Sequence, residues 1–152
     1  MFVSDDDVRN MLHEPFLCLD AEDYDAYLKL CGPEFRYRIT AYSPEFRKDQ
    51  VWLDHDREGM TELFGNIQFD VRLPGKFFRH GHVYRIERDG NGSAKALTSM
   101  VVHYTEPEGD SRVFALCRYH DDIDLSTGTP LLASRGVRLE TGQLGTGSYI
   151  PM

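Results

Sequence analysis

The sequence predicts an α+β domain in which about three N-terminal helices lie against a curved, cone-like antiparallel sheet. Apolar residues recur at helical spacing between residues 8 and 67, and four long runs follow at roughly 78–88, 93–105, 111–123 and 131–141. Turn-forming segments rich in Gly, Pro, Asn and Asp separate these runs. Strands this long twist strongly, so we expect the helices to cover one face of the sheet. At 152 residues, the chain fits a single domain, 1–152.

Caps and apolar spacing mark the first two helices. Ser4 can cap the first, ahead of three Asp residues that suit the positive end of a helix, and Pro15 is expected to kink or end it. Asp20 is the expected cap of the second helix, which Gly32 and Pro33 should end. The apolar positions of this second helix recur at i, i+3, i+4 and i+7: Tyr24, Tyr27, Leu28 and Cys31. We therefore expect Cys31 to be buried as a small apolar residue.

A strand and a third helix are predicted next. Apolar and polar residues alternate over 35–42, which is typical of a strand with one buried face. A loop containing Pro44 follows, and the third helix begins near Asp54 or Asp56. The apolar face of this helix comprises Met60, Leu63, Phe64 and Ile67. Capping therefore explains the Asp-His-Asp cluster at 54–56, and an acid–base pair of His55 with a neighbouring carboxylate is the alternative.

Composition argues against several classes of partner. The formal net charge is −8, so a dense basic face for nucleic acid is not expected. No apolar run approaches the ~18 residues that span a membrane, and the first ten residues lack the pattern of a secretion signal. Three cysteines without close spacing argue against a disulfide framework. We therefore expect a cytoplasmic protein that binds neither nucleic acid nor a membrane.

Cys117 and His120 have the C-x-x-H spacing found in one half of a Rieske iron–sulfur site. Such a site needs two Cys and two His, and the other half, C-x-H, is missing from the sequence. Because Cys117 and His120 are three positions apart on a predicted strand, their side chains also point to opposite faces. We therefore predict that this pair binds no cluster.

His80 and His82 are two positions apart, so they share one face of a predicted strand. His103 on the next strand could join them as a third metal ligand. The H-x-H pattern is nonspecific, however, and hydrogen-bonded histidines are the favoured interpretation. The serines lack a nucleophile motif, and no phosphate-binding loop occurs. The sequence therefore predicts no catalytic, cofactor-binding or metal-binding residue in this chain.

Two features suit contacts with other molecules. Trp52 and the strand tyrosines could line a ligand pocket, and they are equally expected in a core or an interface. The Gly-rich end of the sequence, 141–152, has little of its own to bury. It is expected either to lie against another subunit or to fray in solvent.

The order and spacing of these segments resemble one known family, the small (β) subunits of Rieske-type aromatic-ring-hydroxylating oxygenases. Residues 18–40 look like its acidic turn, aromatic helix and first strand, and 51–60 look like the Asp-rich start of its third helix. The segments that look like its last long strands, including Arg135-x-x-Arg138-Leu139, are 79–90, 99–123 and 131–144. The resemblance covers nearly the whole chain and implies the cone-shaped fold of nuclear transport factor 2 and scytalone dehydratase.

The resemblance also implies a structural role. In the family, the iron–sulfur cluster and the non-haem iron belong to the large (α) subunit, and three large and three small subunits form a hexamer. The expected partners are therefore the catalytic α subunit and further copies of this chain as a trimer, in a complex that oxidises an aromatic or small sulfonated substrate. Two alternatives remain open on this fold. A pocket enzyme (a dehydratase, isomerase or cyclase) would use Asp54, His82 and His103 for acid–base chemistry, and a binding module would hold a ligand or peptide in its concavity.

Overall fold

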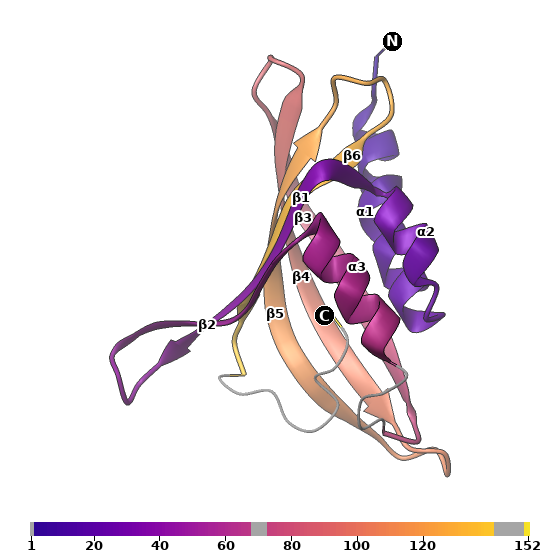
Figure 1. The fold of residues 1–152 in the computed structure, drawn as a ribbon, viewed down its shortest axis with the longest axis vertical. Coiled ribbons are helices and arrows are strands. Elements are labelled where there is room, and N and C mark those ends of the chain that lie inside the picture. Colours follow the sequence, from indigo (N-terminus) through magenta and orange to yellow (C-terminus); the bar gives the residue numbers. More distant parts are fainter. Residues whose placement is uncertain (1, 68–72, 142–150) are drawn as a thin grey trace.

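The computed structural model describes residues 2–67, 73–141 and 151–152, and in it three helices lie on the concave side of a curved sheet (Figure 1). The elements in chain order are α1 (Asp5–Asp20), α2 (Tyr24–Lys29), β1 (Cys31–Ser43), β2 (Lys48–Asp56), α3 (Arg57–Asn66), β3 (Lys76–Arg88), β4 (Ser93–Thr105), β5 (Ser111–Asp124) and β6 (Leu131–Leu139). The predicted α+β cone is therefore confirmed. Within the described ranges, no helix is both long and apolar enough to cross a membrane.

The sheet has six strands in the order β2-β1-β6-β5-β4-β3. Every neighbouring pair is antiparallel except β1 and β6, which run in the same direction. The predicted antiparallel arrangement therefore holds for the meander β3–β6, but the sheet as a whole is mixed, because β1 and β6 are parallel. The parallel pair arises because the last strand of the meander docks beside the first strand of the hairpin. The strands β2 and β3 consequently form opposite edges of the sheet.

Helix α1 begins as predicted and continues further than predicted. The Ser4 Oγ accepts the Asp7 N–H at 3.1 Å, and the Asp7 carboxylate accepts the Ser4 N–H at 2.9 Å, which forms a capping box. Pro15 does not end the helix, which extends to Asp20. A proline inside a helix costs about 3 kcal/mol. Pro15 and its neighbour Phe16 are buried, so packing of this face against the sheet outweighs that cost.

Helix α2 is shorter than predicted and has a different cap. Asp23, rather than Asp20, accepts the Ala26 N–H at 3.1 Å, and the helix ends at Lys29. Cys31 is buried as expected, but it opens β1, and Gly32 and Pro33 follow it in that strand. Asp20 is the last residue of α1. The second helix therefore uses the cap nearest to its own first turn.

The segment that precedes α3 forms a strand that the sequence did not reveal. Residues Lys48–Asp56 pair with β1 as an edge strand, and none of them is fully buried. Without a buried face, such a strand lacks the period-two apolar pattern on which prediction relies. The Asp56 carboxylate accepts the Gly59 N–H at 2.8 Å, which confirms Asp56 as the cap of α3, whereas Asp54 and His55 belong to β2.

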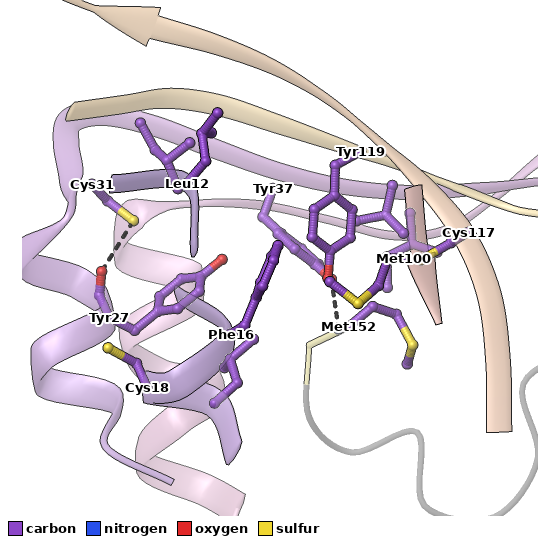
Figure 2. Packing of buried hydrophobic residues seen from close by; sticks show 14 of the residues in the cluster. Leu12, Phe16, Cys18, Tyr27, Cys31, Tyr37, Met100, Cys117, Tyr119 and Met152 are labelled. Carbon is purple, nitrogen blue, oxygen red and sulfur yellow. Dashed lines mark hydrogen bonds between the residues drawn. The ribbon is translucent and has the colours of Figure 1, made fainter. Parts of the chain in front are cut away.

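The core lies between the three helices and the concave face of the sheet. Alternate residues of β1 point inward, as the period-two pattern of 35–42 predicted, and β4 and β5 alternate in the same way. Gly81 in β3 allows α1 to approach the sheet closely, because a Cβ at this position would come within 2.5 Å of the Phe16 ring and 2.8 Å of the Met100 methyl group. The concave face is therefore filled by side chains of the helix and the strands, as Figure 2 shows.

Candidate functional site

The three residues predicted for acid–base chemistry in a pocket enzyme do not meet. Asp54 lies on the edge strand β2, where it accepts a hydrogen bond from the Arg36 Nε at 2.8 Å. That hydrogen bond lowers the pKa of the Asp54 carboxyl. His82 and His103 lie on β3 and β4, across the sheet from β2, so Asp54 is separated from them by the intervening strands.

The strand histidines lie on the convex face of the sheet. His82 is exposed, and its ring contacts that of Tyr84 with 5.4 Å between centroids. The rings of His80 and His103 meet edge to face at 5.2 Å, so the structure brings together the two histidines that belong to different strands. In the part of the chain that the structure describes, no group of three His, Cys, Asp or Glu side chains could hold a metal ion.

Cys117 and His120 point to opposite faces of β5, as their spacing predicted. Cys117 is buried in the interior, and His120 is exposed on the convex side. Burial raises the pKa of the Cys117 thiol to about 12. One metal could not reach both side chains, so the geometric argument from the sequence is confirmed for this pair.

A buried ion pair lies inside the cone. Arg135 of β6 is directly opposite Asp121 of β5, and its Nε and Nη2 each donate to one carboxylate oxygen at 2.9 Å. Both side chains are fully buried, and the guanidinium lies 4.2 Å from the centroid of the Tyr119 ring. Burial opposes the charged form of Arg135, but the charge and hydrogen bonds of Asp121 outweigh it and raise the pKa of the guanidinium. The guanidinium of Arg135 is thus held in its charged form.

A second cation, Arg79 of β3, ties three parts of the chain together. Its Nη1 donates to Asp20 at the end of α1 (2.7 Å), and its Nη2 donates to the carbonyl oxygen of Pro151 (2.8 Å). The Arg79 side chain is buried, and Asp20 is largely buried with it. Asp20, which the sequence suggested as a helix cap, is therefore an ion-pair partner. This pair also offsets the negative end of the α1 dipole.

The tyrosine hydroxyls of the interior are poorly suited to acid–base work. Tyr37 accepts the Met152 N–H at 2.9 Å, while the hydroxyls of Tyr27 and Tyr119 and the Nη1 of Arg135 have no hydrogen-bond partner in the described structure. Burial raises the pKa of all three tyrosines above the ordinary value. These hydroxyls stay neutral in the physiological range.

The sequence contained a signal for the buried charges of Asp121 and Arg135 that the prediction missed. Asp121 has the same phase as Cys117 and Tyr119 in the alternation of β5, and Arg135 has the same phase as Val137 in β6. A charged residue at an inward position of a strand needs a partner, because an unpaired buried charge is very costly. Arg138, by contrast, is on the outward phase and pairs with Asp49 at 2.7 Å.

Two exposed apolar surfaces lie away from the interior. The first, here called the hairpin patch, lies on the β1–β2 hairpin, whose end projects from the body of the molecule (Figure 1). Its residues are Tyr42, Phe46, Val51 and Trp52, each between 43% and 58% exposed. The second, here called the sheet patch, comprises exposed apolar residues of β3 and β5, on either side of β4. Its residues are Phe78, Tyr84, Val113 and Leu116. Apolar surfaces of this kind mark contacts with other proteins.

Comparisons with known proteins identify the family. No family model matches the chain. The β subunit of the methanesulfonate monooxygenase hydroxylase of Methylosulfonomonas methylovora is 30% identical over 156 aligned positions, which cover 97% of this chain and 86% of the relative. The β subunit of the 2-aminobenzenesulfonate 2,3-dioxygenase of an Alcaligenes species is 28% identical over 134 residues, covering 88% of this chain and 89% of the relative.

Solved structures agree on the fold. The β subunit of a putative aromatic-ring-hydroxylating dioxygenase from Novosphingobium aromaticivorans superposes with a TM-score of 0.79 at 19% identity, covering 91% of this chain and 90% of that one. A putative scytalone dehydratase from the same species superposes with a TM-score of 0.64 at 14% identity, over 92% and 87% of the two chains. The fold is thus the cone of nuclear transport factor 2. Together with the identity to the two curated subunits, it shows that this chain belongs to the family of small (β) subunits of Rieske-type ring-hydroxylating oxygenases.

Proposed function

We propose that this chain is the structural subunit of a Rieske non-haem iron oxygenase and holds catalytic α subunits in position. The observation that carries this proposal is the filled cone. Its buried polar side chains in the described part of the chain are Arg79, Thr98, Asp121 and Arg135, and both arginines are engaged in ion pairs. A pocket enzyme needs a titratable group within reach of a substrate. Here the space that a substrate would need holds side chains.

The substrate of the complex is proposed to be a sulfonate. Both curated relatives are named for sulfonates, one an alkanesulfonate and the other an aromatic aminosulfonate. The chemistry would take place on the α subunit, which would carry the iron–sulfur cluster and the non-haem iron. Whether the complex inserts one oxygen atom or two is a property of that subunit.

We further propose three small and three large subunits in one complex, located in the cytoplasm. The three cysteines are all free and buried, which suits a reducing compartment. The hairpin patch and the sheet patch provide separate apolar surfaces, as a subunit with two kinds of neighbour requires. A rigid sheet suits such a role, because strands hold partners more precisely than loops do.

Co-expression with a Rieske-type α subunit of the same organism tests this proposal. The expected result is co-purification in one complex, with iron and the iron–sulfur absorption band in the α subunit. The small subunit purified alone should form trimers of the 17.5 kDa chain and should contain no iron. Light scattering that finds a strict monomer, with and without the α subunit, would contradict the scaffold role. So would iron or turnover in the small subunit alone.

A pair of matched variants tests the surface. Trp52→Ser in the hairpin patch should weaken the complex and leave the fold of the isolated chain intact. Leu17→Ser is the control, because Leu17 is also exposed but lies on α1, outside both patches. Equal loss of assembly in both variants would argue against the hairpin patch as a contact.

A further inference from the structure

The interior of the cone holds a short segment of its own chain. The sequence suggested that the Gly-rich end lies against another subunit or frays, and residues 142–150 of that segment are outside the described residues. Pro151 and Met152, however, are buried inside this chain, and Met152 is only 2% exposed. For these two residues, both expectations were wrong. The reason is the apolar surroundings and the two hydrogen bonds that the interior offers them.

The polar backbone groups and the side chain of the Pro151–Met152 segment each contact a matching group in the interior. The carbonyl oxygen of Pro151 accepts from the buried Arg79 guanidinium at 2.8 Å, and the Met152 N–H donates to the Tyr37 hydroxyl at 2.9 Å. The Met152 side chain belongs to the buried cluster, and Figure 2 shows it beside Met100, with Tyr37 and Tyr119 next to them. One backbone acceptor, one backbone donor and one apolar side chain are thus each matched.

The receiving groups belong to the folded body of the chain. Arg79 lies on β3, Tyr37 on β1 and Met100 on β4, three strands of one sheet. Arg79 also keeps its ion pair with Asp20, so its guanidinium remains oriented when the segment leaves. Its Nε, moreover, is buried and has no hydrogen-bond partner in the described structure, so it could donate to a second oxygen. We therefore expect these receiving groups to keep their positions when Pro151 and Met152 are absent.

We infer that the concave interior is a binding site for a short peptide segment, which Pro151 and Met152 occupy in cis. The class of ligand follows from the contacts: a carbonyl oxygen for Arg79, an N–H for the Tyr37 hydroxyl and an unbranched apolar side chain beside Met100. This inference concerns the chain alone and does not rest on the proposed assembly.

A chain that ends at residue 150 tests the inference. Removal of a buried Met side chain and two hydrogen bonds should lower Tm by roughly 5–15 °C. Acetyl-Pro-Met, added at millimolar concentration, should restore part of this loss in a saturable way and should leave the full chain unaffected. Met60→Ala is the matched control, because Met60 is a fully buried methionine of α3 that does not belong to the site. The peptide should not rescue it.

A second measurement uses the full chain, in case the shortened one does not fold. Hydrogen peroxide oxidises exposed methionines, and mass spectrometry resolves each position. Met152 should be protected as well as Met60 and Met100 are, and Tyr37→Phe should speed oxidation of Met152 more than about tenfold while Met60 stays protected. Rapid oxidation of Met152 in the unaltered chain would overturn the inference. Failure of the peptide to stabilise a folded, shortened chain would overturn it as well.

Discussion

Replacement of Asp121 by Asn should destabilise the chain severely, because it leaves the charge of Arg135 buried without a counter-ion. Both side chains are fully buried, and two hydrogen bonds of 2.9 Å join them. Breaking a buried pair by removing one partner costs about 3–5 kcal/mol. A domain of this size loses roughly 2–4 °C of Tm per kcal/mol, so Asp121→Asn should lower Tm by roughly 6–20 °C.

The adjacent residue provides the control. Asp122 also carries a salt bridge, with its Oδ1 2.8 Å from the Lys95 Nζ, but the two side chains are 52% and 77% exposed. Exposed pairs contribute about 0–1 kcal/mol, so Asp122→Asn should change stability little. The two variants have the same chemistry one position apart and differ only in the face of β5 that they occupy.

Urea denaturation measures the free energy of unfolding of each variant. The comparison with the unaltered chain holds when the free energy falls with urea concentration at the same slope in all three proteins. A cost below about 1 kcal/mol for Asp121→Asn would refute the reasoning, since it would mean that water reaches the pair. A double variant, Asp121→Leu with Arg135→Met, tests the physical cause. Removal of both charges should recover most of the loss, because the penalty comes from the unpaired charge rather than from the missing hydrogen bonds.

Three further predictions follow from the described contacts. Cys31 and Cys117, whose pKa values burial raises to about 12, should react with iodoacetamide at pH 8 roughly a thousandfold more slowly than in urea; equal rates would place the thiols in solvent. Asp56→Ala removes the cap of α3 and should cost about 1 kcal/mol in urea denaturation, while a neutral effect would disprove the cap. The hydrogen bond from Lys95 lowers the pKa of the Asp122 carboxyl in the folded chain. The ionised carboxylate therefore contributes to stability above about pH 4, and this contribution is lost as the pH falls through the lower pKa of the folded state. In denaturation series between pH 5 and pH 3, Asp122→Asn should therefore flatten the loss of stability, and an unchanged slope would contradict this.

Most of the fold could be predicted because most of its elements carry a buried face. The strand β1 was located from its alternation, and β3, β4, β5 and β6 were located as long runs between turn residues. The strand β2 was missed because backbone pairing with β1, rather than burial, holds it. The prediction that Pro15 could end the first helix was wrong for a related reason. Its local cost was visible in the sequence, and the tertiary packing that outweighs it was not.

Of the features of the candidate site, the sequence predicted the orientation of Cys117 and His120 but not the buried ion pairs. The opposite orientation of Cys117 and His120 followed from a period of two, which strand geometry fixes without any tertiary information. To predict the pairs of Arg135 with Asp121 and of Arg79 with Asp20, one must know which strands and helices are neighbours. A single sequence does not contain this information. Proximity of the end of the sequence to Arg79 is the extreme case, because 72 positions separate Arg79 from Pro151.

The two faces of β5 show how one strand can serve both the interior and an interface. On the inward face, the aromatic ring of Tyr119 and the ion pair of Asp121 with Arg135 fill part of the interior, and the two charges of the pair are matched. Outward, Leu116 and His120 remain exposed on a surface that a partner could cover. For Asp121 to act as a free acid or base, its ion pair with Arg135 would have to break, at about the cost of breaking a buried pair. Because that cost is a large part of the stability of an ordinary domain, we expect this cone to evolve new contacts on its convex face sooner than new chemistry in its interior.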